Sequence, residues 1–354
     1  MRILYGVVGE GLGHAMRALV VAPYLVSQGH EVRVFASGRA YNVLAAKLAH
    51  VQRIEGLSLH YTDNRINKGK TAWSNLKNLA PGLSHNVGQW LELLAGFEPD
   101  VVLSDFESWT WLCARVFGLP IVSLDNIQVL SRCDHPRSIR KGHEADFQIA
   151  RQVVKGKLPG CDHYLISTFI PAAVSKKRTT LVPPLLRPAV LDATPVRGDH
   201  VVVYQSGPGC GELSDLLGKH KGTEFRIYGA RPELLAPEVE GHLHFMPYSE
   251  SNFLTDLISC RAVVASAGHT LMTEALHLGK PMLALPLEGQ FEQMLNARWL
   301  AHLGLGLCSE KPRPRDVGEL LERDKDLSRR LAREPRRGNQ AALHSLQAIL
   351  HAVT

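Results

Sequence analysis

Short runs of apolar residues recur along the first half of the chain, separated by stretches long enough to form a helix. These runs cover residues 2–8, 31–36, 100–104, 120–124 and 162–167. Near-continuous apolar strands that alternate with helical segments are typical of a parallel sheet covered by helices on both faces. The pattern therefore predicts an α/β fold with a doubly wound sheet.

A proline-rich stretch over residues 183–195 interrupts this pattern, after which the pattern begins again. The new apolar runs cover residues 200–205, 224–228, 242–246, 262–266 and 281–285. We therefore expect two Rossmann-like domains, over residues 1–185 and 199–330, joined by a Pro-rich linker at 186–198. Residues 331–354 are expected to form a C-terminal helical segment, with Gly338 as a break in the helical stretch.

The length of 354 residues is sufficient for two separate cores. The six cysteines lie far apart with no C-x-x-C, a distribution typical of neither a disulfide framework nor a zinc site. No apolar run approaches the roughly 20 residues of a membrane span, and no signal-peptide pattern is found. The expected location is the cytoplasm.

The formal net charge of +6 favours acidic partners, such as nucleotides or phospholipid surfaces. No nucleic-acid-binding motif is found, so no nucleic-acid partner is expected. One basic cluster has two interpretations, a solvated helix face or a contact with an acidic membrane at its inner side. Its members are Arg329, Arg330, Arg333, Arg336 and Arg337.

The sequence GEGLGHAMR, residues 9–17, directly follows the first predicted strand. A glycine-rich turn there usually brings backbone N–H groups and a helix N-terminus against a phosphate, so Gly9, Gly11 and Gly13 are candidates for an acceptor or phosphate loop. The spacing is not G-x-G-x-x-G, and the second strand ends without the acidic residue that a dinucleotide site uses. The loop therefore disfavours nicotinamide or flavin binding, and no cofactor is expected.

His14 and Asp105 form the candidate catalytic pair. Both are expected at the carboxyl edge of the first sheet, where open α/β sheets bind ligands. The imidazole is suited to general-base catalysis, and a carboxylate beside it would hold its tautomer and stabilise its charged form. The alternatives are that His14 caps the first helix or packs under the loop, and that Asp105 caps the helix after its own strand.

Two further segments carry polar residues at predicted strand ends. Ser206, Gly207 and Gly209 follow the strand that opens the second domain and repeat the glycine-rich turn, so they are candidates for contacts with the donor phosphates. Residues 266–297, SAGHTLMTEALHLGKPMLALPLEGQFEQMLNA, combine a small-residue turn, a helix, a buried strand and a polar loop. This block resembles the nucleotide-sugar-binding half of GT-B glycosyltransferases. It is similar to the enzyme that adds N-acetylglucosamine to lipid I, and the whole chain resembles an uncharacterised bacterial and archaeal glycosyltransferase family that opens with GEGLGH.

The resemblance implies two Rossmann-like domains that face each other across a cleft, with the donor in the second domain. It implies that the donor diphosphate contacts a helix N-terminus and that Glu274 binds the ribose hydroxyls. The implied phosphate contacts, beside those at Ser206, Gly207 and Gly209, are Ser266, Gly268, His269 and Thr270. The implied sugar contacts are Glu288, Gln290, Glu292 and Gln293. The alternatives are a surface charge for Glu274 and a helix cap for Gln293.

The resulting hypothesis is a metal-independent transferase that moves a hexose-type sugar from a nucleoside diphosphate, with UDP-sugars favoured, to an unknown acceptor. A lipid-linked or anionic acceptor is one expectation, and Tyr61, Trp73 and Trp90 either line an acceptor groove or pack the loop that carries them. The alternatives are a UDP-sugar 2-epimerase and a non-catalytic protein that binds nucleotide sugars. The sequence Asp324-Lys325-Asp326 imitates a metal-binding D-x-D, but we expect a solvated helix face there, and Asp105-Phe106-Glu107 is the nearest other imitation.

Overall fold

The computed structural model describes residues 1–9, 11–56, 61–62, 65–66, 87–88, 90, 96–205 and 210–354, with the backbone alone at 61–62, 65–66 and 210–213. The chain divides into two compact units. The first unit comprises Met1–His60, Asn67–Arg187 and Gly338–Thr354, and the second comprises Tyr61–Ile66 and Pro188–Arg337. The boundary between the units falls between residues 187 and 188, and residues 338–354 of the expected C-terminal segment belong to the first unit.

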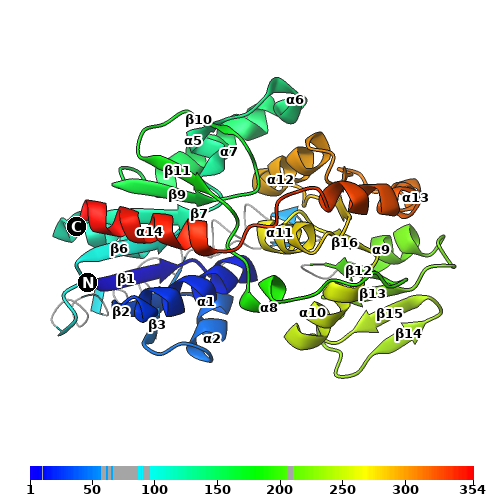
Figure 1. Ribbon diagram of the computed structural model, residues 1–354, viewed down its shortest axis with the longest axis horizontal. Helices are drawn as coiled ribbons and strands as arrows, with labels where there is room; N and C mark the ends of the chain where they lie inside the picture. Colours follow the sequence, from blue (N-terminus) through cyan, green and yellow to red (C-terminus); the bar gives the residue numbers. More distant parts are fainter. Residues whose placement is uncertain are drawn as a thin grey trace. The chain divides into compact units, whose positions relative to one another are not determined.

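The first unit is built on a seven-stranded sheet of order β11-β9-β7-β6-β1-β2-β3, in which all pairings are parallel (Figure 1). Its strands are β1 (Arg2–Val7), β2 (Glu31–Ala36), β3 (Val51–Arg53), β6 (Val101–Asp105), β7 (Ile121–Asp125), β9 (His163–Ser167) and β11 (Thr179–Val182). Its helices of eight or more residues are α1 (Leu12–Ser27), α2 (Gly38–Ala45), α4 (Ser108–Phe117), α7 (Glu144–Lys157) and α14 (Gln340–Val353). The short elements are α5 (Val129–Arg132), α6 (Arg137–Arg140) and the strand pairs β8 (Cys133–Asp134) with β10 (Ala173–Val174) and β4 (Tyr61–Thr62) with β5 (Arg65–Ile66).

Alternation along β1 places helices on both faces of this sheet. Ile3, Tyr5 and Val7 belong to a buried core that also includes residues of α1 and α14. The intervening Gly6 points to the other face, where a Cβ atom on it would lie 2.0 Å from Thr110 Oγ1 of α4. The strand therefore needs both its apolar residues and this glycine to be covered on both sides.

The second unit repeats the arrangement with a seven-stranded sheet of order β14-β15-β13-β12-β16-β17-β18. Its strands are β12 (Val201–Tyr204), β13 (Phe225–Tyr228), β14 (Glu238–Glu240), β15 (Leu243–Met246), β16 (Ala262–Ala265), β17 (Met282–Ala284) and β18 (Leu307–Cys308), and β14 alone among them is antiparallel to its neighbour. Its helices are α8 (Pro188–Leu191), α9 (Cys210–Leu217), α10 (Glu250–Ser259), α11 (His269–His277), α12 (Phe291–His302) and α13 (Pro314–Leu331). Leu216 and Leu217 of α9 and Val317 and Leu320 of α13 pack in its core.

Both sheets reverse their strand order at one point, between β1 and β6 in the first unit and between β12 and β16 in the second. The carboxyl edge beside such a reversal is where open α/β sheets bind ligands. All ten expected strands are present in these sheets, so the expected fold class of two doubly wound Rossmann-like domains is confirmed. The expected break near Gly338 is also present, because α13 ends at Leu331 and α14 begins at Gln340.

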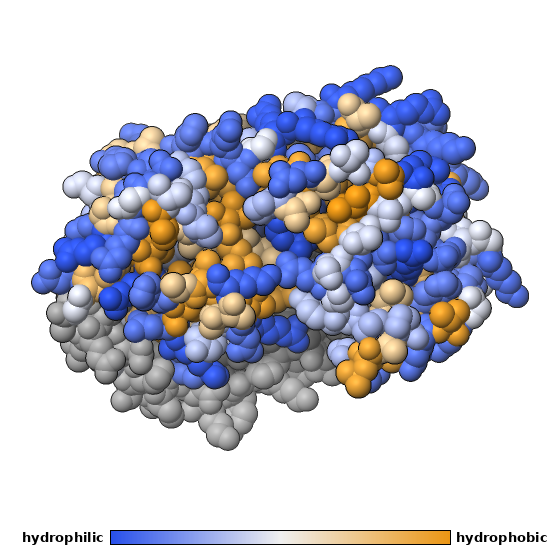
Figure 2. Space-filling view, turned by 60° about the horizontal axis from the view of Figure 1, so that its bottom comes forward, coloured by the Kyte–Doolittle hydropathy of each residue, from blue (hydrophilic) through white to orange (hydrophobic). Residues whose placement is uncertain are grey.

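Three observations bear on the expectations drawn from composition: the helices, the exposed surface and the cysteines. In the described part of the chain, no helix combines the length and apolar character needed to cross a bilayer. On the face in Figure 2, hydrophilic residues interleave with hydrophobic ones and cover most of the described rim. Of the cysteines whose side chains are described, Cys113, Cys133, Cys161 and Cys260 are buried with free thiols, as expected of small core residues.

Candidate functional site

The glycine loop after β1 brings α1 to the carboxyl edge of the first sheet. A Cβ atom on Gly9 would lie 2.5 Å from the backbone oxygen of Ser37, so only glycine lets the loop pack against the end of β2. Gly11 has φ of 78° and precedes the first residue of α1. Gly13 and His14 therefore lie in the first turn of α1, and His14 does not cap the helix.

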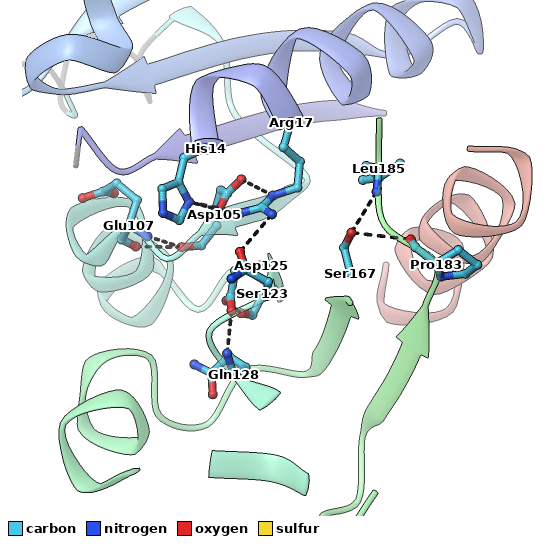
Figure 3. A network of polar contacts seen from close by, with 12 residues as sticks. His14, Arg17, Asp105, Glu107, Ser123, Asp125, Gln128, Ser167, Pro183 and Leu185 are labelled. Carbon is cyan, nitrogen blue, oxygen red and sulfur yellow. Dashed lines mark hydrogen bonds and ion pairs between the residues drawn. The ribbon is translucent and has the colours of Figure 1, made fainter. Parts of the chain in front are cut away.

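His14 and Asp105 are in contact. His14 Nδ1 lies 2.6 Å from Asp105 Oδ1, at the end of β6, and the carboxylate is fully buried while 12% of the imidazole is exposed (Figure 3). Asp105 is free to make this contact because Glu107, not Asp105, caps α4. The Glu107 carboxylate accepts hydrogen bonds from the backbone N–H groups of Trp109 and Thr110, at 2.8 and 2.6 Å.

Arg17, one helical turn after His14, completes this cluster and was not among the expected site residues. Its Nε and one terminal nitrogen (Nη2) donate to the two Asp105 oxygens, each at 2.7 Å, and its other terminal nitrogen (Nη1) donates to Asn126 Oδ1 at 3.2 Å. The i, i+3 spacing of His14 and Arg17 at a helix start is the sequence signal that could have identified it. An arginine at such a position otherwise reads as a surface charge.

The charges in this cluster offset one another. Burial alone would raise the pKa of Asp105, but the neighbouring Arg17 charge and the His14 contact outweigh it and hold that pKa below its usual range. Burial would lower the pKa of Arg17, but the Asp105 charge raises it, so the pair is ionised. Burial raises the pKa of Tyr5 far above its usual value, so the phenol next to Asp105 is neutral.

The tautomer of His14 follows from these contacts. Arg17 Nη2 lies 3.1 Å from His14 Nδ1, but a guanidinium only donates, and the shorter contact of Nδ1 is with the carboxylate. We therefore assign the proton to Nδ1, which donates to Asp105. The lone pair then lies on Nε2, which is the nitrogen that can accept a proton from a substrate.

Backbone strain marks the same edge of the sheet. Phe106, between Asp105 and Glu107, has φ of 54°, a conformation that is uncommon for a bulky residue. The turn lets Asp105 face α1 while Glu107 faces the start of α4. Strain of this kind clusters at functional sites, although the structure gives it a local role as well.

In the second unit, β16 leads through Ser266 and Gly268 into α11. Gly268 is the N-cap residue of α11, and a Cβ atom on it would meet no atom of the described residues within 4 Å. Among the described residues, neither packing nor φ requires glycine there, and a helix N-terminus of this kind can bind an anion. His269 is buried and Thr270 is half-buried in the first turn of this helix.

Glu274 is buried, with 2% of its surface exposed, and is not the surface charge of the alternative interpretation. The helix α12, which follows the polar loop, is tied to the turn before α11 by Asn296. The Asn296 side-chain amide donates to the backbone oxygen of Ala267 at 3.1 Å and to Glu292 Oε1 at 3.4 Å. The two segments of the resemblance are therefore neighbours, and Asn296 was not among the expected residues.

Gln293 stabilises the polar loop itself. Its Oε1 accepts a hydrogen bond from the backbone N–H of Leu287 at 3.1 Å, and its Nε2 donates to Gln290 Oε1 at 2.6 Å. Gln290, rather than Gln293, is the N-cap residue of α12, and Glu288 is exposed in the loop. The proposed sugar contacts of Glu288, Gln290, Glu292 and Gln293 stay predictions.

Other expected residues lie outside this description. Ser206, Gly207, Gly209 and Trp73 are not among the described residues, nor is the side chain of Tyr61. Tyr204 pairs with Ala265, so β12 ends beside β16 at the same edge. Trp90 is buried against Trp109, with ring centroids 6.0 Å apart. Of the two interpretations of Trp90, this contact agrees with the one in which it packs the loop.

The expected solvated face at Asp324-Lys325-Asp326 is wrong for Asp324. The Asp324 side chain is 2% exposed, and one of its oxygens accepts hydrogen bonds from Arg197 at 2.7 Å and Arg261 at 2.6 Å. The residue lies on the buried side of α13 and pairs with two arginines. In the part of the chain that the structure describes, no group of three or more His, Cys, Asp or Glu is placed to hold a metal ion.

Comparison with known proteins decides the family. The family model described as glycosyl transferase family 1 matches residues 1–323. The chain belongs to this family. An uncharacterised glycosyltransferase of Methanosarcina acetivorans is 26% identical over 343 residues, which span 90% of this chain and 88% of that protein. An uncharacterised glycosyltransferase of Methanosarcina mazei is 24% identical over 345 residues, again 90% and 88% of the two chains.

Solved structures share the fold of this glycosyltransferase. The glycotransferase of kitacinnamycin has a TM-score of 0.69 at 16% identity, covering 100% of this chain and 99% of the other. The spinosyn rhamnosyltransferase SpnG complexed with thymidine diphosphate has a TM-score of 0.63 at 19% identity, covering 98% and 100%. The fold is thus the two-domain GT-B fold of glycosyltransferases.

Proposed function

We propose that this glycosyltransferase moves a hexose-type sugar from a nucleoside diphosphate to an acceptor hydroxyl, with His14 as the general base. The observation that carries the proposal is the 2.6 Å contact between His14 Nδ1 and Asp105 Oδ1 at the strand-order reversal of the first sheet. It leaves Nε2 with its lone pair on a side chain that is partly exposed.

In the proposed direct displacement, the acceptor oxygen forms a bond to the anomeric carbon of the donor sugar, and the bond from that carbon to the diphosphate oxygen breaks. The acceptor proton moves to His14 Nε2, and the electron pair leaves with the diphosphate. Asp105 stabilises the imidazolium through Nδ1–H. The backbone N–H groups that begin α11 would stabilise the charge that develops on the diphosphate.

We propose that the reaction needs no divalent metal. The carboxylates of both D-x-D imitations have protein partners: Asp105 binds Arg17 and His14, Glu107 caps α4, and Asp324 binds two arginines. Hard cations prefer such oxygens, and here cationic side chains and backbone N–H groups occupy them. The diphosphate charge would instead be met at the N-terminus of α11.

We propose a UDP-sugar as the donor, because residues 266–297 resemble the enzyme that acts on lipid I. The solved rhamnosyltransferase holds thymidine diphosphate, so thymidine nucleotides form the comparison. A lipid-linked or anionic acceptor is supported by the net charge of +6 and by the exposed arginines at 329, 330, 333, 336 and 337. The same arginines are the proposed contact with an acidic membrane.

A thermal-shift panel of uridine, thymidine, adenosine and guanosine diphosphates and their sugars tests the donor assignment, because a ligand stabilises the fold by mass action. We expect uridine nucleotides to give the largest shift.

Glu274→Ala should weaken nucleotide binding by about 1–3 kcal/mol, because the ribose hydroxyls lose their carboxylate partner. Glu310→Ala, which removes a surface carboxylate of the same unit that pairs with Arg298, is the matched control. Unaltered affinity in Glu274→Ala would place Glu274 outside the site, and no shift with any nucleotide would contradict the proposed function.

A further inference from the structure

Arg17 lies at the centre of the His14 cluster, and all three of its guanidinium nitrogens have partners (Figure 3). Asp105 Oδ1 accepts from both Arg17 Nη2, at 2.7 Å, and His14 Nδ1, at 2.6 Å. The carboxylate is therefore shared between a permanent cation and a group that becomes a cation when it takes a proton. In a simple His–Asp pair, the full carboxylate charge would favour the imidazolium.

The geometry places the guanidinium close enough to act on His14 directly. Arg17 Nη2 is 3.1 Å from His14 Nδ1, and 5% of the arginine and none of Asp105 is exposed. Water therefore screens little of the repulsion between the guanidinium and a protonated imidazole. A second proton on His14 would create two adjacent cations that share one carboxylate.

The other titratable and polar groups around the cluster have hydrogen-bond partners or burial of their own. On β1, Tyr5 is neutral. After β6, the Glu107 carboxylate is held by the N-terminal backbone of α4 and by Thr110 Oγ1 at 2.7 Å. On β7, Asp125 accepts from the backbone N–H of Gln128 and from Ser123, and Asn126 Oδ1 accepts from Arg17. Among the described residues, Arg17 is thus the cation that faces His14, and Asp105 is the anion that they share.

We propose that Arg17 is a positioning residue that keeps His14 in its proton-accepting form, by fixing Asp105 with two hydrogen bonds and opposing protonation of the imidazole. The inference rests on the proposed role of His14 as a base and adds the residue that sets the pH range of that base. With Arg17 present, Asp105 orients the neutral His14 ring through Nδ1–H, and Nε2 keeps its lone pair until the acceptor proton arrives.

The test follows the titration of the His14 ring by ¹H–¹⁵N NMR, with the His14 signals assigned by their loss in His14→Gln. Arg17→Gln should move the titration midpoint upward by roughly one pH unit or more, because Asp105 is left with His14 alone. Arg17→Lys retains the charge and should give a smaller shift. Arg115→Gln removes an exposed arginine at the far end of α4 and should leave the midpoint unchanged.

A second pair of variants keeps the test decisive if Arg17→Gln does not fold. Asp105→Asn and the double variant Arg17→Gln/Asp105→Asn differ only at Arg17, and neither leaves a buried carboxylate without its arginine. We expect the higher midpoint in the double variant. Equal midpoints in this pair, or a folded Arg17→Gln protein that titrates as the parent does, would overturn the inference. Failure of the base role itself appears separately, as undiminished turnover in His14→Ala, since the titration does not depend on turnover.

Discussion

At the scale of single residues, two buried aspartates on neighbouring strands have opposite electrostatic environments. The Asp105 carboxylate is ionised and forms an ion pair with Arg17. The Asp125 carboxylate instead accepts hydrogen bonds from the backbone N–H of Gln128 and from the Ser123 hydroxyl. Burial, followed by the nearby Asp105 charge, raises the pKa of Asp125 to about 6, and the hydrogen bonds reduce the rise. The folded protein therefore holds a proton on Asp125 more tightly than the unfolded chain does.

The sign of the resulting pH dependence follows from linkage. Because the folded-state pKa lies above the unfolded value of 3.8, the contribution of Asp125 to stability is greatest below about pH 4 and is lost as the pH rises through about 6. The loss corresponds to roughly 3 kcal/mol. Asp125→Asn cannot ionise, so its stability relative to the parent should increase by about this amount between pH 4 and pH 7.

Urea unfolding at several pH values measures this difference. Tryptophan fluorescence is suited to it because, of the described tryptophans, Trp90, Trp109 and Trp111 belong to the first unit and Trp299 belongs to the second. Asp199→Asn, at an exposed aspartate, is the control and should run parallel to the parent. A parallel profile for Asp125→Asn as well would show that Asp125 does not have a raised pKa.

At the scale of elements, α13 presents a buried and an exposed aspartate two residues apart. Asp324 pairs with Arg197 and Arg261, whereas Asp326 pairs with Arg329 with about three quarters of each side chain exposed. Asp324→Ala leaves two partly buried guanidinium groups without their carboxylate and should lower the free energy of unfolding by about 1–3 kcal/mol. Asp326→Ala should change it by no more than about 0.5 kcal/mol.

Thermal unfolding of both variants, with and without Mg²⁺, measures this contrast. We expect the midpoint of Asp324→Ala to fall and that of Asp326→Ala to stay near the parent, with Mg²⁺ shifting neither. Equal midpoints for the two variants would show that the arginine pairs contribute no net stability. A Mg²⁺-dependent rise in the parent that Asp324→Ala abolishes would identify a metal site.

The sequence predicted the central strands well because strands buried on both faces are almost continuously apolar, as in β1, β6 and β16. It did not predict β14 and β18, since Glu238–Glu240 is exposed and Leu307–Cys308 is only two residues long. The helical character of α14 was readable from its periodicity. The core in which α14 packs was not predictable, because the apolar face of an amphipathic helix does not specify the sheet that it will cover.

The residues of the candidate site were likewise predictable only in part, because the hydrophobic pattern places strand ends but does not say which side chains contact one another. His14 and Asp105 were predictable because both follow apolar strands at one sheet edge. The identity of the residue that caps α4 was not predictable, since Asp105 and Glu107 are both acidic and near the helix start. Arg17 and Asp324 were missed for the complementary reason: a charged residue in a helix pairs with groups that lie far away in the sequence, at positions 105, 197 and 261.

At the scale of the whole molecule, the two units repeat one topology with different polar residues at their carboxyl edges. The first unit places a histidine, an arginine and a carboxylate there, and the second places the N-terminus of α11 there. This division agrees with a proton acceptor in one unit and an anion site in the other. The α14 helix returns the chain to the first unit, where Leu346 and Leu350 join the core.

Metal independence is a property of the whole protein and is tested on it directly. Release of nucleoside diphosphate from the donor should be unchanged within about twofold in excess EDTA, because backbone N–H groups would meet the diphosphate charge. The control is the same assay with Mg²⁺ or Mn²⁺ added back. Turnover that falls with chelator and returns with metal would contradict the proposal, and Asp105 and Glu107 would then be the first residues to test as ligands.

The most direct test of the central claim is the turnover of His14→Ala, measured as nucleoside diphosphate release at saturating donor, with donor affinity measured in parallel. His143→Ala, at another partly exposed histidine of the first unit, is the matched control. We predict that turnover in His14→Ala falls by roughly 10²–10⁴-fold while donor affinity stays nearly unchanged, since the base acts on the acceptor proton. Turnover in His14→Ala close to that of the parent would contradict the account and remove His14 from the mechanism.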